Sequence, residues 1–452
     1  MANTTTSIVT FSILSPDASL SYDRIKLRLE EYRTLLASDL DTIELSTENG
    51  KTVICRMQAK EMEEFLDQAE ILLENVVQSR DMSTLVVLHH LRDLSEVLDN
   101  LKLYDECRLT GNCALDLAEA LGRRSLEFRQ EQAETIALIA GLSVYQPRAR
   151  TLFIQAVSVC EEVVENNPSH SNKFKLLTLL VRAGYWALGD LGPQWLERAI
   201  ELMTKELPPT MVDPSLRSVI YHSYGYSLYQ LKQYTNAAEA YHESISIRRV
   251  LAKNNPAKYN CYLAGTLVNA AIIFDGLGKC SDAIVAYKEV LDICTAMSAP
   301  DPFQYNELMA NTLINYGATL GNLKQFSEAA ALQKQAISFY RNLGHEKTGK
   351  LCAALHDYGS SCYLLGKHAE AVLAYQESIP LWRARAATDP EQEIYLRRTL
   401  HNIANSFNAL GKCVEADAAA IEALEGHHGR VFTPCSFLPD FKSCFVCQRV
   451  TI

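Results

Sequence analysis

Small and apolar residues recur along this chain at two spacings. Within single stretches they follow the three- and four-residue steps of a helix, as in Leu267, Ala270, Ala271 and Phe274. At longer range, one small residue is followed by others 12 and 19 positions later, often with a large residue at 16. The first small residue of each group, here called the anchor, is clearest at Gly225, Ala271, Gly317, Gly359 and Ala404. The pattern predicts helix pairs that repeat along the chain.

Three weaker anchors continue the pattern towards the amino terminus. They are Ser95, Ala137 and Gly184, the last with a small insertion over residues 189–193. The eight anchors lie 41 to 47 residues apart, about 44 on average. We therefore expect about eight repeats where the chain length alone would suggest about three separate domains.

Turn signals separate the two helices expected in each repeat. Gly278, Gly366 and Gly411 follow the first helix, where glycine supplies the positive φ of a helix C-cap. Polar residues near the start of the second helix are candidate N-caps: Asn236, Ser281 and Ser327. Pro380 falls inside a second helix, where we expect a kink or early termination.

The unit over residues 400–412, with Ala416, Ala420 and Ala423 after it, resembles the tetratricopeptide repeat (TPR). The longer period is similar to the kinesin light chain subclass and to repeats attached to fungal and bacterial signalling ATPases. The resemblance covers roughly residues 88–425. It implies an all-α fold, a right-handed α-solenoid of about eight TPR-like helix pairs.

The two ends lack the repeat and define the expected domains. Residues 1–87 are an N-terminal cap region, 88–425 the superhelical array, and 426–452 a Cys- and Phe-containing tail that we expect to be flexible. In the cap we expect helices over 20–37 and 58–79. A small β-hairpin over 42–55 is suggested by the Asn-Gly turn signal, with an irregular loop as the alternative. The tail either covers the last repeat with its phenylalanines, is disordered, or marks a truncated larger protein.

Composition narrows the function classes. The chain has 452 residues, of which 43 are Lys or Arg and 54 Asp or Glu, a net charge of −11. This acidic balance disfavours nucleic acid and anionic membranes as partners. There is no apolar run long enough to span a membrane and no basic residue before the short apolar stretch near the start. The 13 scattered cysteines indicate reduced thiols, so we expect a cytoplasmic protein.

The candidate catalytic and metal motifs are weak. The Gly-Lys pairs are followed by Cys280, His368 and Cys413 where a phosphate loop needs Ser or Thr. The tail holds a single CxxC motif, Cys444 to Cys447, with further Cys and His upstream, and free thiols are the simpler interpretation. We therefore expect no enzyme, no cofactor and no metal site.

The candidate binding residues lie on the inner edge of the first helices. Asparagine recurs two residues before the anchor, and further polar residues lie one turn away on the same face. The predicted peptide-binding set is Asn269, Asn311, Asn315, Arg398, Asn402 and Asn405. An amide both donates and accepts hydrogen bonds, so it can hold a peptide backbone. The resemblance implies this role for asparagines that line a concave groove, and a merely solvated groove is the alternative.

These observations predict a non-catalytic interaction scaffold or adaptor that binds an extended peptide or partner helix in its concave groove. The alternative is a sensor or autoinhibitory repeat arm of a STAND-type signalling ATPase system, or a fragment of a larger such protein. The early groove carries an acidic balance: His89, Arg92, Asp93, Glu96, Asp99, Glu131 and Glu134. A protein or peptide partner with a basic segment at that end is the expectation.

Overall fold

The computed structural model describes residues 25–27, 29–30, 33, 43–46, 52–55, 64–72, 84–123, 125–142, 146–186, 190–297, 302–343 and 348–425. The chain forms two compact units, residues 1–213 and 214–452, each of which is described by itself. The predicted three-part division remains a prediction, and the tail over 426–452 lies outside the described residues.

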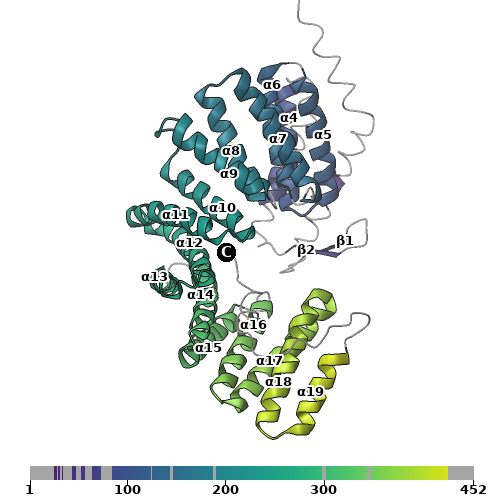
Figure 1. Ribbon diagram of the computed structural model, residues 1–452. Coiled ribbons are helices and arrows are strands. Elements are labelled where there is room, and N and C mark those ends of the chain that lie inside the picture. The colour runs from purple at the N-terminus through teal and green to yellow at the C-terminus, as the bar shows by residue number, and fades with distance from the viewer. Residues whose placement is uncertain are drawn as a thin grey trace, which may run out of the picture. The chain divides into compact units, whose positions relative to one another are not determined.

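The first unit contains three helix pairs (Figure 1). The pairs are α4 (Thr84–Asn100) with α5 (Tyr104–Gly122), α6 (Leu126–Ala140) with α7 (Gln146–Asn166), and α8 (His170–Trp186) with α9 (Leu191–Glu201). A turn of π-helix, η3 (Leu202–Glu206), extends α9. Ahead of the pairs, strands β1 (Ile43–Ser46) and β2 (Thr52–Cys55) form an antiparallel hairpin in the segment where the sequence suggests one.

The second unit contains five helix pairs (Figure 1). They are α10 (Pro214–Gln230) with α11 (Tyr234–Asn254), α12 (Pro256–Gly276) with α13 (Cys280–Met297), α14 (Pro302–Asn322) with α15 (Phe326–Asn342), α16 (Thr348–Leu364) with α17 (His368–Thr388), and α18 (Glu393–Ala409) with α19 (Cys413–Glu425). A 3₁₀ turn, η5 (Pro390–Gln392), precedes α18. The described residues therefore hold eight pairs across the two units, and the predicted α-solenoid is confirmed.

Within each unit, every helix packs on the next one along the chain, and first helices also contact first helices. The latter contacts join α4 to α6 and α6 to α8 in the first unit, and α10 through α18 stepwise in the second. Because the first helices approach one another most closely, they line the inner side of each unit. This is the edge on which the sequence places the candidate binding residues.

The anchors are small because a bulky partner lies against them. A Cβ atom on Gly359 would lie 2.6 Å from the Tyr375 ring, and one on Gly225 would lie 3.0 Å from the Tyr241 ring. The small residues 12 positions after the anchors are also fully buried, including Ala237, Ala283, Ala329 and Ala371. Close packing of helix on helix thus accounts for the period.

Six turns between paired helices share one backbone conformation. The residue seven positions after the anchor has a positive φ in each: Lys102, Lys232, Gly278, Lys324, Gly366 and Gly411. The amide of the following residue donates to a carbonyl five residues earlier, as Gln233 does to Leu228 at 2.9 Å. This is the Schellman pattern that ends a helix.

Two local expectations were wrong. Helix α17 continues through Pro380 to Thr388, so early termination at this proline was wrong, while a kink there stays a prediction. Ser281 and Ser327 each lie at the second residue of a helix, one position inside it, and Asn236 lies at the third. The residue before α15, Gln325, makes no side-chain cap; the tight turn provides backbone bonds at this helix start instead.

Candidate functional site

The six predicted site residues all belong to first helices of the second unit. Asn269 comes from α12, two come from α14 and three from α18. Those on α12 and α14 are buried, with exposed fractions of 4% for Asn269, 2% for Asn311 and 7% for Asn315. Those on α18, Arg398, Asn402 and Asn405, are half-buried. The three residues on α18 are therefore the most exposed part of this row.

Asn311 has an internal partner that the sequence did not indicate. The Tyr340 hydroxyl donates to its side-chain oxygen at 2.7 Å, within a buried contact between α14 and α15. This bond ties the two helices of one repeat together. Asn311 is thus a structural residue as well as a member of the predicted set.

Asn269 and Asn315 hold amide groups that lack a partner. Both side-chain polar atoms of Asn269, and Nδ2 of Asn315, are buried without a hydrogen bond among the described residues. The Tyr241 hydroxyl lies near Asn269, but no hydrogen bond of ordinary geometry joins them. A buried amide without a partner costs about 1–3 kcal/mol. The same position in successive repeats carries this cost twice.

A histidine and a threonine connect α16 to α18. Nδ1 of His356 lies 2.9 Å from the Thr399 hydroxyl, which itself donates to the Tyr395 carbonyl at 2.8 Å. The hydroxyl therefore accepts from Nδ1, which leaves Nε2 free to accept from the Asn402 amide at 3.5 Å. Burial, with Arg398 nearby, lowers the pKa of His356 to about 3, so the ring is neutral.

In the second unit, Asp357 is the one acidic residue at the asparagine position, two residues before the anchor. Burial raises the pKa of its carboxyl to about 7, against the opposing effect of Arg398. Since its side chain is only half-buried, the carboxyl can still exchange its proton with water. The α16–α18 part of the inner edge therefore holds a titratable group beside a fixed cation.

The histidine arrangement recurs between α10 and α12. Nδ1 of His222 lies 3.2 Å from the Thr266 hydroxyl, and its ring packs against Tyr241 as that of His356 packs against Tyr375. Burial and the nearby Arg248 likewise lower the pKa of His222 to about 3. The sequence signal is a His three residues before one anchor and a Thr five residues before the next.

Arg248 adds a buried cation to this second arrangement. It is 4% exposed and donates to the Tyr262 carbonyl at 2.8 Å and to the Thr266 hydroxyl. Burial lowers its pKa to about 10, so it stays charged at neutral pH. Neutral oxygen atoms satisfy the guanidinium among the described residues, and no carboxylate pairs with it there.

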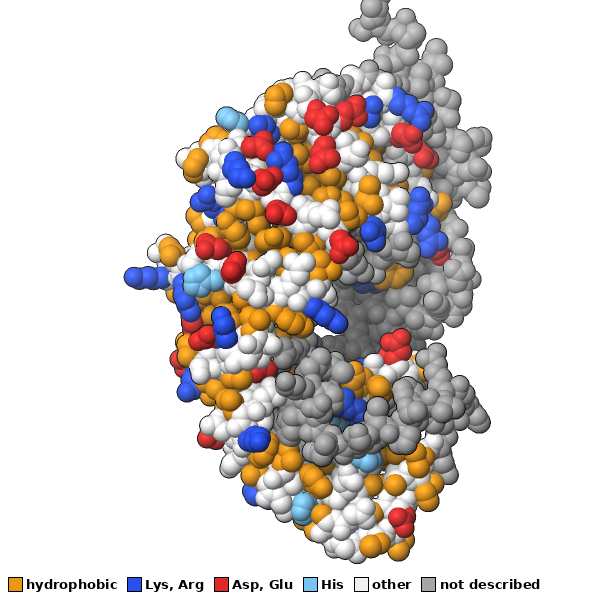
Figure 2. All heavy atoms as spheres, viewed as in Figure 1, with side chains coloured by type: hydrophobic (Ala, Val, Ile, Leu, Met, Phe, Trp, Pro, Cys, Tyr) orange, Lys and Arg blue, Asp and Glu red, His pale blue; other side chains and the backbone are white. Residues whose placement is uncertain are grey.

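The inner edge of the first unit is charged and largely paired. Glu131 lies 3.1 Å from His89 and 3.3 Å from Arg92, and Glu134 lies 3.1 Å from Lys175. Acidic and basic side chains are mixed over the face of this unit seen in Figure 2. Of the acidic residues predicted at this edge, Asp93 and Glu96 are the exposed ones that form no ion pair among the described residues.

The outer face of the second unit has a regular series of ion pairs. An Arg 24 positions after one anchor pairs with a Glu 18 positions after the next: Arg249 with Glu289 at 2.6 Å, Arg341 with Glu377 at 2.7 Å, and Arg383 with Glu422 at 2.6 Å. At the α13–α15 junction the corresponding residues are Thr295 and Gln335, which cannot form an ion pair. The α13–α15 junction therefore lacks the Arg–Glu ion pair that joins the other neighbouring second helices of this unit.

Within the described residues no helix is long and apolar enough to cross a membrane. The same part of the chain contains no group of three or more His, Cys, Asp or Glu residues that could hold a metal ion. The Cys and His residues of the tail, considered above as candidate metal ligands, lie outside the described residues.

Two family models that describe the tetratricopeptide repeat match the chain, over residues 308–384 and 219–250. These segments correspond to α14–α17 and to the α10–α11 pair. No curated protein matches the chain significantly.

Solved structures provide a separate comparison. A Signal Transduction ATPase with Numerous Domains (STAND) protein with a tetratricopeptide repeat sensor, from Pyrococcus horikoshii, matches 82% of this chain and 53% of its own, at 14% identity and a TM-score of 0.50. The quorum sensor NprR from B. thuringiensis matches 81% of this chain and 97% of its own, at 14% identity and a TM-score of 0.48. A putative kinesin light chain from Podosopora anserina with nearly identical TPR-like repeats matches 47% of this chain and 94% of its own, at 16% identity and a TM-score of 0.37. The matching repeat models, the observed helix pairs and the period of their anchors identify tetratricopeptide repeats within the chain, with the model matches at residues 219–250 and 308–384.

Proposed function

We propose that the chain is a non-catalytic scaffold that binds an extended peptide of a partner protein along the inner edge of its second unit. The observation that carries the proposal is that both polar side-chain atoms of Asn269 and Nδ2 of Asn315, at one position of successive first helices, are buried without a hydrogen bond among the described residues. A peptide backbone offers alternating donors and acceptors, which is what these amides lack. Binding would then remove a cost that the free protein bears.

The half-buried residues of α18 extend this row to where a partner can first reach it. Arg398, Asn402 and Asn405 offer a guanidinium and two amides. Arg398 can bind a carbonyl or carboxylate, while Asp357 can accept a basic side chain. We expect backbone contacts to provide most of the affinity, and these two charged groups to provide selectivity.

The test replaces Asn269, Asn315 and Asn402 together by alanine in the full chain. The probe is a peptide selected against the wild-type chain from a random phage-display library. Its affinity should fall at least tenfold, while thermal stability changes little, because alanine favours helices and removes the orphan atoms of Asn269 and Asn315, which offsets the loss of the Asn402 contact to His356. Methylating the peptide's backbone nitrogens should weaken binding more than replacing its side chains by alanine.

Asn342→Ala is the matched control, because Asn342 is exposed at the last residue of α15, a second helix, and does not belong to the row on the first helices. This variant should bind the peptide as the wild type does. Equal affinity of the triple variant and the wild type for every selected peptide would rule out the inner-edge site.

A second candidate function is the sensor arm of a STAND-type signalling ATPase. The missing ion pair at the α13–α15 junction favours it, since a sensor needs a joint that can change its angle, and this junction has no such ion pair to break when it does. A nucleotide-binding chain that co-purifies with this protein, and whose ATP hydrolysis it alters, would support this function over a free-standing adaptor.

A further inference from the structure

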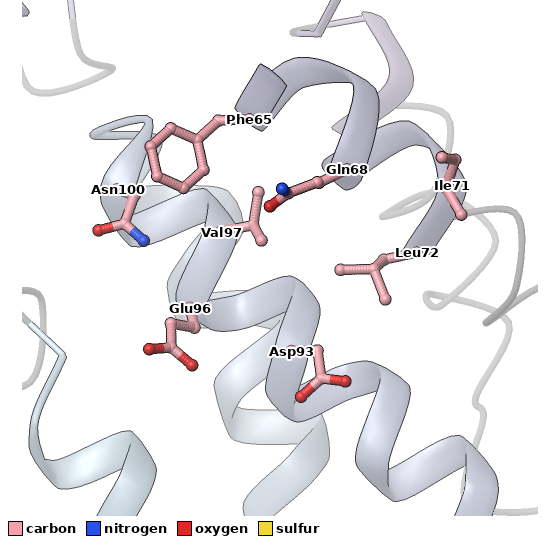
Figure 3. Close-up of a pocket in the computed structure, with 8 residues that line it drawn as sticks. All are labelled: Phe65, Gln68, Ile71, Leu72, Asp93, Glu96, Val97 and Asn100. Atoms are coloured by element: carbon pink, nitrogen blue, oxygen red, sulfur yellow. The ribbon is translucent and has the colours of Figure 1, made fainter. Parts of the chain in front are cut away.

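A pocket of about 500 Å³ lies in the first unit, where the helix over residues 64–72 meets α4 (Figure 3). Each helix contributes side chains at helical spacing: Phe65, Gln68, Ile71 and Leu72 from one, and Asp93, Glu96, Val97 and Asn100 from the other. The volume falls within the range of about 300–1,000 Å³ that is usual for ligand sites. A pocket of this size can take a few side chains of a partner.

The wall formed by residues 64–72 is held firmly in place. Leu66 and Ala69 of this segment are fully buried. On its far side Arg33 donates to Asp67 at 2.6 Å and to Glu70 at 2.7 Å. The residues that face the pocket are therefore supported by a packed helix, so a ligand would not have to order this wall.

The pocket combines apolar surface with negative charge. Phe65 and Leu72 are half-buried, and Ile71 is 60% exposed, so apolar side chains at the pocket are open to a partner. Asp93 and Glu96 are exposed on the α4 side and have no ion pair among the described residues, in contrast to Glu131 and Glu134 on the neighbouring repeat.

The basic residues near Asp93 and Glu96 either pair with another acidic residue or belong to a more distant repeat. Arg92, the neighbour of Asp93 in the chain, pairs with Glu131. Arg182 of α8 interacts electrostatically with Glu96 from the next repeat but one. Asp93 is thus left as a carboxylate with no cation assigned to it in this part of the structure, directly beside an apolar cavity.

We propose that this pocket docks a segment of a partner protein in which Arg or Lys stands next to a bulky apolar residue. The apolar side chain would enter between Phe65, Leu72 and Val97. The basic side chain would reach Asp93 and Glu96 at the edge. The site lies in the first unit and is independent of the inner-edge site proposed for the second, so either can fail without the other.

The test measures binding of a fluorescent twelve-residue peptide, with two Arg flanking a Leu-Phe pair in a Gly-Ser background, to the full chain. Asp93→Asn and Glu96→Gln should each weaken binding about tenfold, because a charge-assisted hydrogen bond is lost. Ile71→Ser should weaken it without unfolding the protein, since Ile71 is already exposed. Binding should also fall as salt concentration rises.

Three controls separate this site from others. Asp116→Asn removes an exposed carboxylate of α5 outside the pocket and should leave affinity unchanged. The triple alanine variant of Asn269, Asn315 and Asn402 should also bind the basic peptide normally. A peptide with Glu in place of Arg should not bind.

Any of three results would overturn the proposal. They are failure of the basic peptide to bind the wild-type chain, equal affinity for the pocket variants and the wild type, and dimerisation that Asp93→Asn abolishes in sedimentation experiments. The last result would mean that the pocket receives a second copy of this chain.

Discussion

The inner edges of the two units use the same repeat for opposite chemistry. In the first unit, Glu131 pairs with Arg92 and contacts His89, and Glu134 pairs with Lys175, all partly exposed. In the second unit the corresponding edge carries asparagines and neutral histidines, mostly buried and in part without partners. Exposed ion pairs stabilise a protein little, whereas buried polar groups affect its free energy strongly in either direction.

The difference teaches where each unit is sensitive. A charged, solvated edge selects partners by charge and loses strength in salt. A neutral, buried edge responds to protons and to the loss of single hydrogen bonds. The same small anchors support both edges, because the anchors are set by packing between helices and place no demand on the inner surface.

The largest expected effect is a loss of stability in acid that comes from the second unit. His222 and His356 have pKa values of about 3 in the folded protein, below the ordinary 6.5. Between pH 3 and pH 6.5 these histidines are protonated in the unfolded chain but neutral in the folded chain. Their contribution to the free energy of unfolding is therefore present above pH 6.5 and is lost as pH falls. From pH 7.5 to pH 5 we expect a loss of about 2 kcal/mol per histidine.

Urea unfolding of the wild type and of a double His222→Asn, His356→Asn variant checks this expectation. Asparagine can still bond to Thr266 and Thr399 but does not titrate. The difference in unfolding free energy between the two proteins should shrink by about 4 kcal/mol on acidification. A difference that is independent of pH would show that the two rings reach water, and the contrast between the edges would then be lost.

A smaller effect of opposite sign is expected at Asp357. Its pKa of about 7 lies above the ordinary 3.8, so its contribution to stability is present below about pH 4 and is lost as pH rises through 7. Asp357→Asn should therefore stabilise the protein at pH 8 by about 1–2 kcal/mol, a value reduced because the side chain is half-buried. The gain should diminish at pH 5.

Asp417→Asn corrects for the general loss of negative charge, because Asp417 is exposed on α19 of the same unit. Urea unfolding at both pH values provides the measurement. If the two asparagine variants gain stability equally at pH 8, Asp357 is no more desolvated than a surface carboxylate, and the inner edge is less enclosed than its neighbours indicate.

The sequence was sufficient to predict the helix pairs and their phase, because steric contact fixes them locally. Gly359 must be small where Tyr375 crosses it, and Ala371 is buried for the same reason. The state of the candidate site could not be predicted in this way. Whether Asn311 has a partner depends on Tyr340, and the pocket depends on the placement of residues 64–72 against α4. Both are tertiary contacts between separate helices.

The smallest expected effect tests whether both units share one backbone frame. Lys102 of the first unit, and Lys232 and Lys324 of the second, hold the positive φ that glycine holds in the other three turns. The left-handed conformation costs an ordinary residue about 1–2 kcal/mol, and glycine avoids this cost but loses about 0.5–1 kcal/mol in chain entropy on folding. Each Lys→Gly substitution should therefore stabilise the protein by about 0.5–1 kcal/mol, and similarly in both units. Thermal unfolding provides the measurement, with Lys279→Gly, one residue beyond Gly278, as the control that should give no gain. A gain confined to one unit would mean that the turns differ, so that the contrast between the inner edges would reflect different backbones as well as different side chains.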